Sequence, residues 1–404
     1  MVKEKAIAPF KLARLPEIHF GPGSLAKLAA LAAGFGRRAL VVTGGGSLQA
    51  SGWRDNIVRD LEKEKLELSF AASADEPTPE LVDAAAAEHR PEGKRPDVVI
   101  AIGGGSVMDA GKAMAAMIPV QGGESVADFL EDLGKGAAHS GVKIPFIAVP
   151  TTAGTGSEAT KNAVLGRHGS DGFKKSLRHD NFVPDIAIVD PELTLSCPSE
   201  VSAACGLDAF VQLMESYVSR NANPMTDALA AGAMDAAKNH VTAAAGHGAD
   251  KIETRTAMAY ASLVSGITLA NAGLGLAHGF ATEIGGMFPI PHGVICGTLI
   301  TPVTQRTIER LRENAAAPEN QAFLKKYAAM GAMLGSVDPY NIELACATLL
   351  RVLEAWTGKL HIKKLGHYGV TEADLRVIAD KTSNKHNPVE LGRKDLFAIL
   401  KERL

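Results

Sequence analysis

The sequence predicts two domains, an α/β domain with a mostly parallel sheet followed by an all-α domain. Up to about residue 193, short β-branched runs alternate with longer helical patterns, an order typical of a helix-covered parallel sheet. After this point strand-like runs become scarce, and long stretches rich in Ala and Leu take over. Because 404 residues suffice for two hydrophobic cores, we expect domains at residues 1–193 and 194–404.

The individual elements follow from these patterns. Short β-branched, apolar runs predict buried strands at 38–43, 97–102, 145–150 and 185–190. Helical patterns between them predict helices at 24–33, 53–63, 79–89 and 107–117. In the second domain, helices are expected at 200–220, 225–239, 254–270, 320–334 and 342–353.

Charge, cysteine spacing and hydropathy indicate which partners and which cellular setting to expect. A net charge of -3 gives no electrostatic reason to expect nucleic acid or an anionic membrane as a partner. The four cysteines show no CxxC spacing, which favours a reduced, cytoplasmic setting over a disulfide framework. The first residues lack the apolar core of a signal peptide, and no apolar run reaches transmembrane length. We therefore expect a cytoplasmic protein.

The sharpest nucleotide-binding signal follows the strand expected at 97–102. Gly103, Gly104, Gly105 and Ser106 stand between that strand and the next helix. A turn needs one glycine, whereas three let the backbone approach a pyrophosphate, and a helix N-terminus adds unpaired N–H groups. The position of the loop at the carboxyl end of a parallel strand also favours ligand binding.

Two further strand ends support a nucleotide site. The segment from Thr151 through Thr152 and Thr155 to Glu158 offers several hydroxyl donors. The first strand ends in glycines, with Gly44 and Ser47 placed where an acidic residue commonly holds the adenosine ribose 2′-OH. No acid stands there, so the sequence leans toward NADP(H) without excluding NAD(H).

A metal-ligand pattern occupies the second half. Asp208 and Gln212 are four residues apart, so they share one face of a helix, and His278 and His292 follow. A carboxylate with two imidazoles is a donor set for first-row transition metals. Gln212 is the exception, because a neutral amide oxygen is a weak ligand for such a metal. The remaining histidines stand mostly in polar or loop contexts, which are typical of solvated side chains.

These motifs together resemble the iron-containing (group III) alcohol dehydrogenases, relatives of glycerol dehydrogenase and dehydroquinate synthase. The resemblance rests on Ile18-His-Phe-Gly-Pro-Gly-Ser, Gly103-Gly-Gly-Ser-Val-Met-Asp, Thr151-Thr-Ala-Gly-Thr-Gly-Ser-Glu, Asp190-Pro-Glu-Leu, Gly206-Leu-Asp-Ala-Phe, Ala277-His-Gly-Phe and Pro291-His-Gly-Val, in this order over nearly the whole chain. It implies a Rossmann-like N-terminal domain, a helical C-terminal domain of the dehydroquinate synthase type, an active site between them and a homodimer.

The resemblance also implies roles for particular residues. Gly104, Gly105, Ser106 and Asp109 match the family's phosphate loop; Thr151, Thr152 and Thr155 match its nicotinamide-side loop, with Asn162 and Val164 behind. A lysine that contacts the cofactor ribose matches Lys174 or Lys175, and spacing to Pro184 favours Lys174. Asp208, Gln212, His278 and His292 match the metal ligands.

The metal region departs from the family in two places. The family has His where this chain has Gln212, and it usually has a supporting His where this chain has Thr282. The implied function is an NAD(P)-dependent oxidoreductase of a small alcohol, aldehyde or ketone, with Fe²⁺ or Zn²⁺ at Asp208, His278 and His292.

Other functions remain open from the sequence. A metal-independent carbonyl or oxo-acid reductase would use His278 or His292 as the proton donor and Gln212 to bind substrate. The resemblance also leaves room for a cyclising lyase that uses NAD transiently, a degenerate site with little turnover, and a nucleotide-binding sensor without catalysis.

Overall fold

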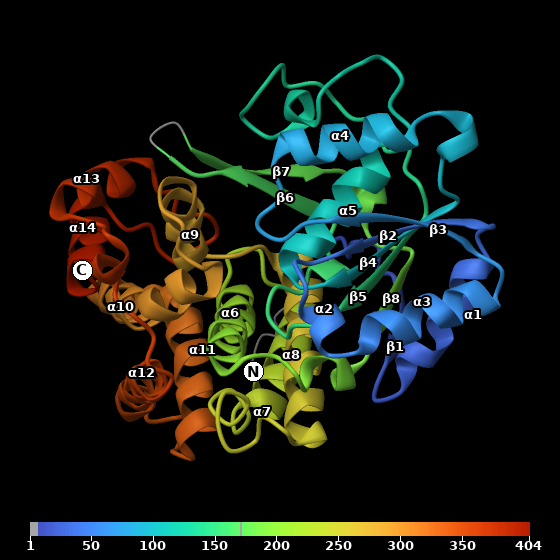
Figure 1. Ribbon diagram of the computed structural model, residues 1–404. Coiled ribbons are helices and arrows are strands. Elements are labelled where there is room, and N and C mark those ends of the chain that lie inside the picture. Colours follow the sequence, from blue (N-terminus) through green and yellow to red (C-terminus); the bar gives the residue numbers. More distant parts are fainter. Residues whose placement is uncertain (1–6, 170–171) are drawn as a thin grey trace.

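The computed structural model describes residues 7–169 and 172–404, and its two halves differ in architecture (Figure 1). The first half holds a six-stranded sheet in the order β1-β8-β5-β4-β2-β3, in which every neighbouring pair is parallel. Its strands are β1 (Glu17–Phe20), β2 (Arg38–Thr43), β3 (Glu67–Ala72), β4 (Val98–Gly103), β5 (Phe146–Pro150) and β8 (Ile186–Val189). The predicted parallel α/β sheet is confirmed.

Helices cover both faces of this sheet because the central strands are apolar on both sides. Leu40 and Val42 of β2 pack in the core beneath α4 and α5, whereas Ala39 and Val41 pack in the core beneath α1 and α3. The helices are α1 (Leu28–Ala33), α2 (Ser47–Ala50), α3 (Trp53–Lys63), α4 (Pro79–His89) and α5 (Gly105–Met117). Alternate residues of one strand thus supply two cores.

The strand order reverses between β2 and β4, which places a crevice at their carboxyl ends. From β2 the chain runs outward to the edge strand β3 and then returns to β4 on the other side of β2. Ligands of open α/β sheets bind at such a reversal. Gly44 and Gly103 lie there beside Val107, so two of the predicted glycine segments meet at one point.

A two-stranded antiparallel hairpin links the halves. It consists of β6 (Asn162–Arg167) and β7 (Phe173–Arg178), and in Figure 1 it extends from the sheet domain toward helix α9 (Leu276–Met287). A Cβ at Gly286 of α9 would lie only 3.3 Å from Cα of Phe173, so the backbones nearly touch. The sequence did not predict these strands, because their residues are too polar to form an apolar run.

The second half is helical, as predicted. Its helices are α6 (Ser199–Tyr217), α7 (Pro224–Ala237), α8 (Ile252–Ala272), α9 (Leu276–Met287), α10 (His292–Glu313), α11 (Pro318–Gly335), α12 (Ile342–Lys359), α13 (Glu372–Lys381) and α14 (Arg393–Glu402). One large core, with Phe210, Phe280 and Leu299 among its buried members, holds them together. The expected boundary at residue 193 falls within the short turn Pro191–Thr194.

Some sequence predictions need correction. The segment expected as one helix at 24–33 begins as a 3₁₀ turn, Ser24–Lys27, and only then becomes α1. Helices α9, α10, α13 and α14 were not predicted, since Gly, Pro and mixed polar residues interrupt their apolar pattern. His89, expected to be solvated, is buried at the end of α4.

No single helix in the described ranges is long and apolar enough to cross a membrane. Helices α8 and α9 meet the length and composition criteria only as a pair bent by 99°.

Candidate active site

The glycine loop after β4 is shaped by close packing. A Cβ at Gly103 would lie 2.6 Å from Val107, and one at Gly105 would lie 2.5 Å from Thr155. Gly104 caps α5 without any side-chain hydrogen bond, so the first N–H groups of a 13-residue helix lack side-chain partners. Packing alone therefore explains two of the three glycines, and the open helix end remains as an anion site.

The threonine segment after β5 is held between the two halves. Thr151 N donates to Gly103 O at 2.9 Å, which fixes the segment beside the glycine loop. A Cβ at Gly156 would lie 2.4 Å from Gly266 N in α8, and one at Gly154 would lie 2.7 Å from Cβ of Cys205 in α6. Two helices of the second half thus determine where this segment lies.

A buried charge cluster, which the sequence did not reveal, joins the two loops. Lys112 Nζ donates to Ser157 O, Ser157 Oγ, Thr160 Oγ1 and Asn162 O at 2.7–3.2 Å. Ser157 Oγ in turn donates to Asp109 at 2.7 Å. Burial lowers the pKa of Lys112 to about 8 and raises the pKa of the Asp109 carboxyl. Asp109 therefore connects the phosphate loop to the threonine segment.

The two candidate ribose lysines differ in their surroundings. Lys174 pairs with Glu76, and its side chain is 14% exposed, whereas Lys175 pairs with Asp132 at 3.3 Å and is 30% exposed. Both line the same cavity. Lys174 is the more enclosed of the two, in line with the sequence preference for this residue.

Three predicted metal ligands converge from three helices. Asp208 of α6 lies with Oδ1 3.4 Å from Nε2 of His278 in α9 and 3.8 Å from Nε2 of His292 in α10. Asp208 Oδ1 and His278 Nε2 are buried without any hydrogen-bond partner in the described structure. Such orphaned atoms cost free energy unless a cation lies between them, so the site suits a divalent metal.

Gln212 has a different geometry from these three. Its Nε2 donates to Asp208 Oδ2 at 3.0 Å, and its Oε1 accepts from Ser265 Oγ at 2.6 Å. The amide orientation follows from chemistry, because an ionised carboxylate can only accept and must face the nitrogen. Both ends of the amide are therefore engaged.

Glu215, on the same face of α6, orients His278. Its carboxylate accepts from His278 Nδ1 at 2.7 Å and from the backbone N–H groups of Gly275 and Ala277 at 2.9 and 2.7 Å. Because a carboxylate only accepts, Nδ1 carries the proton and Nε2 faces Asp208. This is the carboxylate–histidine arrangement that supports metal ligands.

The pKa values of the two imidazoles shift in opposite directions. Burial lowers the pKa of His292 to about 3, aided by the nearby Lys174, so this ring is neutral with a free lone pair. Burial also opposes protonation of His278, but the Cys296 sulfur and the Glu215 carboxylate outweigh it and raise its pKa well above the usual value. Burial favours the neutral acid at Asp208, yet the two rings hold the pKa of this carboxyl below its usual range.

One cavity of about 550 Å³ joins these features, a size within the range of small-molecule sites. Its walls include, from the predicted residues, Gly105, Ser106, Asp109, Thr155, Asn162, Val164, Lys174, Asp208, Gln212, His278 and His292. The other predicted cofactor residues, Gly44, Ser47, Gly103, Gly104, Thr151 and Thr152, are not wall residues and lie at the ends of β2, β4 and β5.

Two protein-family models match the sequence of this chain. A model of the iron-containing alcohol dehydrogenases matches residues 16–191, and a model of the C-terminal domain of the Fe-containing alcohol dehydrogenase family matches residues 202–404. The chain belongs to the iron-containing alcohol dehydrogenase family.

Several relatives span nearly the whole chain. It is 33% identical to long-chain-alcohol dehydrogenase 1 of Geobacillus thermodenitrificans, over 95% of this chain and 94% of that protein. It is 29% identical to the NADPH-dependent butanol dehydrogenase of Clostridium saccharobutylicum over 95% of each, and 29% identical to the NAD-dependent methanol dehydrogenase of Bacillus methanolicus over 91% and 92%. A crystal structure of an archaeal halo-thermophilic Red Sea brine pool alcohol dehydrogenase matches with TM-score 0.88 and 25% identity, over 99% and 100% of the two chains.

Three residues of this family member's site escaped sequence reasoning: Lys112, Glu215 and Cys296. Glu215 stands seven residues after Asp208, so helical spacing was the available signal. Cys296 stands four residues after His292, but this spacing has meaning only once α10 is known to begin at His292. Lys112 carried no signal, because a single lysine in a helix is usually solvated.

Thr282, where the family usually has a supporting His, belongs to a local network. Its Oγ1 donates to His278 O at 2.9 Å and accepts from Lys385 Nζ at 3.2 Å. Lys385 also lines the cavity, and burial lowers its pKa. An ammonium group thus stands near the position of the missing imidazole.

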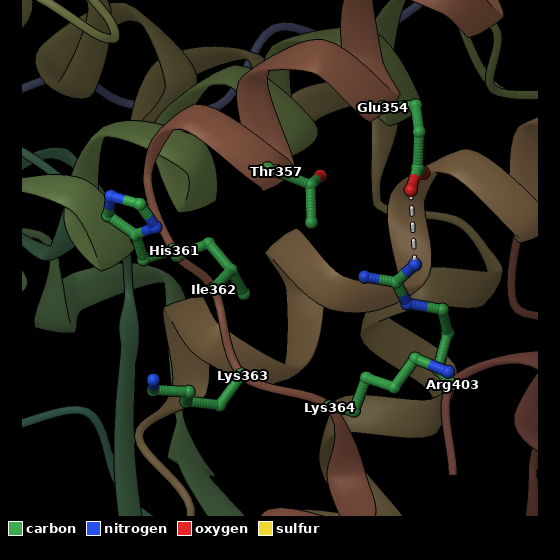
Figure 2. A pocket seen from close by; sticks show the side chains of 8 residues that line it. Glu354, Thr357, His361, Ile362, Lys363, Lys364 and Arg403 are labelled. Atoms are coloured by element: carbon green, nitrogen blue, oxygen red, sulfur yellow. Dashed lines mark hydrogen bonds and ion pairs between the residues drawn. The ribbon is translucent and has the colours of Figure 1, made fainter.

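A separate cavity in the helical half contains none of the predicted site residues. Figure 2 shows Glu354, Thr357, His361, Lys363, Lys364 and Arg403 around it, and its volume is about 310 Å³. Arg403 is already engaged there, since it pairs with Glu354 at 3.4 Å and donates to Thr298 Oγ1 at 3.1 Å. The cavity between the two halves is therefore the candidate active site.

Proposed function

We propose that this alcohol dehydrogenase interconverts a small alcohol with its aldehyde or ketone and uses NAD(P)(H) as the hydride carrier. The observation that carries the proposal is the cavity of about 550 Å³ that joins the glycine loop to Asp208, His278 and His292. Hydride transfer requires the cofactor and the reacting carbon to share one enclosed space, and this cavity borders both groups of residues.

The cofactor is held by the first half in this proposal. Gly103, Gly104, Gly105 and Ser106 receive the pyrophosphate at the N-terminus of α5, while Asp109 fixes the loop from behind. Thr151, Thr152 and Thr155, with Asn162 and Val164, flank the nicotinamide, and Lys174 contacts the ribose. The absence of an acid at Gly44 and Ser47 supports a lean toward NADP(H).

The second half supplies the catalytic and metal-binding residues. Asp208, His278 and His292, with Gln212 beside them, would hold one divalent ion, with Fe²⁺ and Zn²⁺ the expected candidates. Such an ion supplies Lewis-acid chemistry, which polarises a carbonyl and lowers the pKa of an alcohol. Glu215 holds the Nδ1 proton of His278, and His292 stays neutral, so both rings present nitrogen lone pairs once His278 is deprotonated at Nε2.

The metal-independent alternative needs a histidine that can give a proton to a carbonyl oxygen. Burial lowers the pKa of His292 to about 3, so this ring holds no second proton near neutral pH. His278 donates from Nδ1 to Glu215, its Nε2 faces Asp208, and Gln212 is hydrogen-bonded at both ends of its amide. These contacts favour the metal-dependent function. The proposal also includes a cytoplasmic homodimer that takes a small alcohol or aldehyde as substrate and binds neither nucleic acid nor membrane. Its domains are divided at residue 193.

The test is NAD(P)H absorbance with a panel of small aldehydes and ketones, on protein purified without chelator and analysed for metal. We expect turnover that falls on metal removal and returns with Fe²⁺ or Zn²⁺. Full activity in metal-free protein would overturn the metal-dependent mechanism. Cofactor binding without consumption by any substrate would instead support a sensor.

A further inference from the structure

A buried cysteine, which is not among the family's metal ligands, lies next to the three predicted ligands Asp208, His278 and His292. Cys296 lies on α10, one turn after His292, and its Sγ is 3.8 Å from His292 Nε2. One donor atom from each of Asp208, His278, His292 and Cys296 lies within 4.8 Å of the other three. The side chain of Cys296 is completely buried, so its sulfur is enclosed with the other donors.

The spacings suit a single ion. Ligand atoms about 2.0–2.3 Å from a tetrahedral Zn²⁺ lie about 3.3–3.8 Å from one another. Asp208 Oδ1 lies 3.4 and 3.8 Å from Nε2 of His278 and His292, and His292 Nε2 lies 3.8 Å from Cys296 Sγ. Asp208 Oδ1 and His278 Nε2, both on residues at most 3% exposed, have no hydrogen-bond partner among residues 7–169 and 172–404 and face this cluster.

Gln212 makes a poor fourth ligand by comparison. Its oxygen accepts the Ser265 hydroxyl at 2.6 Å, and its nitrogen donates to Asp208 Oδ2. Turning the oxygen toward the ion would place it against Asp208 Oδ2 and remove the hydrogen bond between the amide and this carboxylate. The amide nitrogen of Gln212 instead donates to Asp208 Oδ2, so the other carboxylate oxygen, Oδ1, faces the cluster.

We propose that Cys296 is the fourth protein ligand of the metal, as a thiolate, and that Gln212 is a positioning residue for Asp208. Binding releases one thiol proton to solvent and forms one metal–sulfur bond. A sulfur donor shifts the preference of the site toward Zn²⁺, because thiolates are the softer ligands. His292, whose side chain is 30% exposed, leaves one side of the site open to the cavity.

The proposal rests on the proposed function only in assuming a divalent metal at this site, and its test does not depend on turnover. Metal-stripped full-length protein is titrated with Co²⁺, because a thiolate ligand gives Co²⁺ an intense near-ultraviolet charge-transfer band that N and O ligands do not give. We expect this band in the wild type and in Gln212→Ala. We expect its loss in Cys296→Ser, with Zn²⁺ affinity at least about 100-fold weaker by chelator competition.

Cys205→Ser is the control, because Cys205 is half-buried on the same helix as Asp208, three residues before it, but does not belong to the cluster. This variant should keep the band. X-ray absorption of the Zn²⁺-loaded wild type should show one sulfur at about 2.3 Å. A band that survives in Cys296→Ser, a sulfur-free spectrum, or no Co²⁺ binding by the wild type would each overturn the proposal. A sulfur-free spectrum with intact NAD(P)H turnover leaves the proposed function standing, whereas the band without turnover overturns only that function.

Discussion

Replacing Glu215 with glutamine tests whether this carboxylate positions the metal site. The carboxylate accepts three hydrogen bonds, from His278 Nδ1 and from the N–H groups of Gly275 and Ala277. A glutamine offers one oxygen and one NH₂ group, so at least one of these buried donors faces another donor. The orientation of His278 is then no longer fixed by charge.

The expected loss can be worked from these contacts. One unsatisfied buried donor costs about 1–3 kcal/mol, and the loss of charge weakens the remaining bonds, so Glu215→Gln should lower the free energy of unfolding by about 2 kcal/mol or more. Removing the carboxylate behind a ligating imidazole typically weakens metal binding by about 10–100-fold. Both effects should appear in the same variant.

Urea unfolding of metal-stripped protein gives the first quantity, and competition with a chelator gives the second. Glu313→Gln is the control. Glu313 forms an exposed pair with Arg310 on α10, so this variant should change neither quantity. If Glu215→Gln unfolds at the same urea concentration as the wild type and binds metal equally well, Glu215 does not orient His278.

Three further changes test the cofactor side and the packing between the halves. Gly44→Asp places a carboxylate at the end of β2, where an added Cβ meets Val107 at an ordinary 3.5 Å, and should lower kcat/KM for NADPH by at least about tenfold relative to NADH. An unchanged ratio would refute the ribose assignment. Gly266→Ala puts a Cβ 2.1 Å from Gly156 O and should cost at least about 3 kcal/mol of unfolding free energy, whereas Gly232→Ala in α7 meets nothing within 4 Å and should be neutral or stabilising. Burial raises the pKa of Glu158 from 4.5 to about 7, so the folded state holds this proton to higher pH than the unfolded state. The Glu158 contribution to the free energy of unfolding should therefore fall by up to about 3 kcal/mol as pH rises from 4.5 to 7, and urea unfolding of Glu158→Gln should show a slope with pH that is smaller by this amount.

The sequence predicted those elements whose apolar pattern is continuous. Helices α3 and α4 begin and end at the predicted residues, and the four predicted strands agree to within one residue at each end. The pattern failed where a segment is shaped by contact with another backbone. Gly285 and Gly286 of α9 lie against β7, and Gly293 and Gly297 of α10 lie against α6. These close contacts require glycine, and the glycines interrupt the apolar pattern from which the two helices would have been predicted.

The site was predictable only as far as chain-local motifs reach. Asp208, His278 and His292 carried recognisable flanking residues, and the structure brings them together from three helices. Cys296 and Lys112 have no such flanks, and only tertiary packing puts them beside ionisable groups. A single sequence therefore does not predict site residues whose role depends on contacts with another helix or strand.

The departures from the family pattern argue against a decayed site. In a decaying site, lost ligands should leave buried polar atoms without partners, since nothing maintains the contacts. Here Gln212 is bonded to both Asp208 and Ser265, and Thr282 is bonded to both His278 and Lys385. Among the buried atoms without a hydrogen-bond partner in the described residues, Asp208 Oδ1 and His278 Nε2 face the cluster. Gln212 and Thr282 have their own hydrogen-bond partners, while the ligand atoms that face the cluster stay free, which is the arrangement expected of a site that holds a cation.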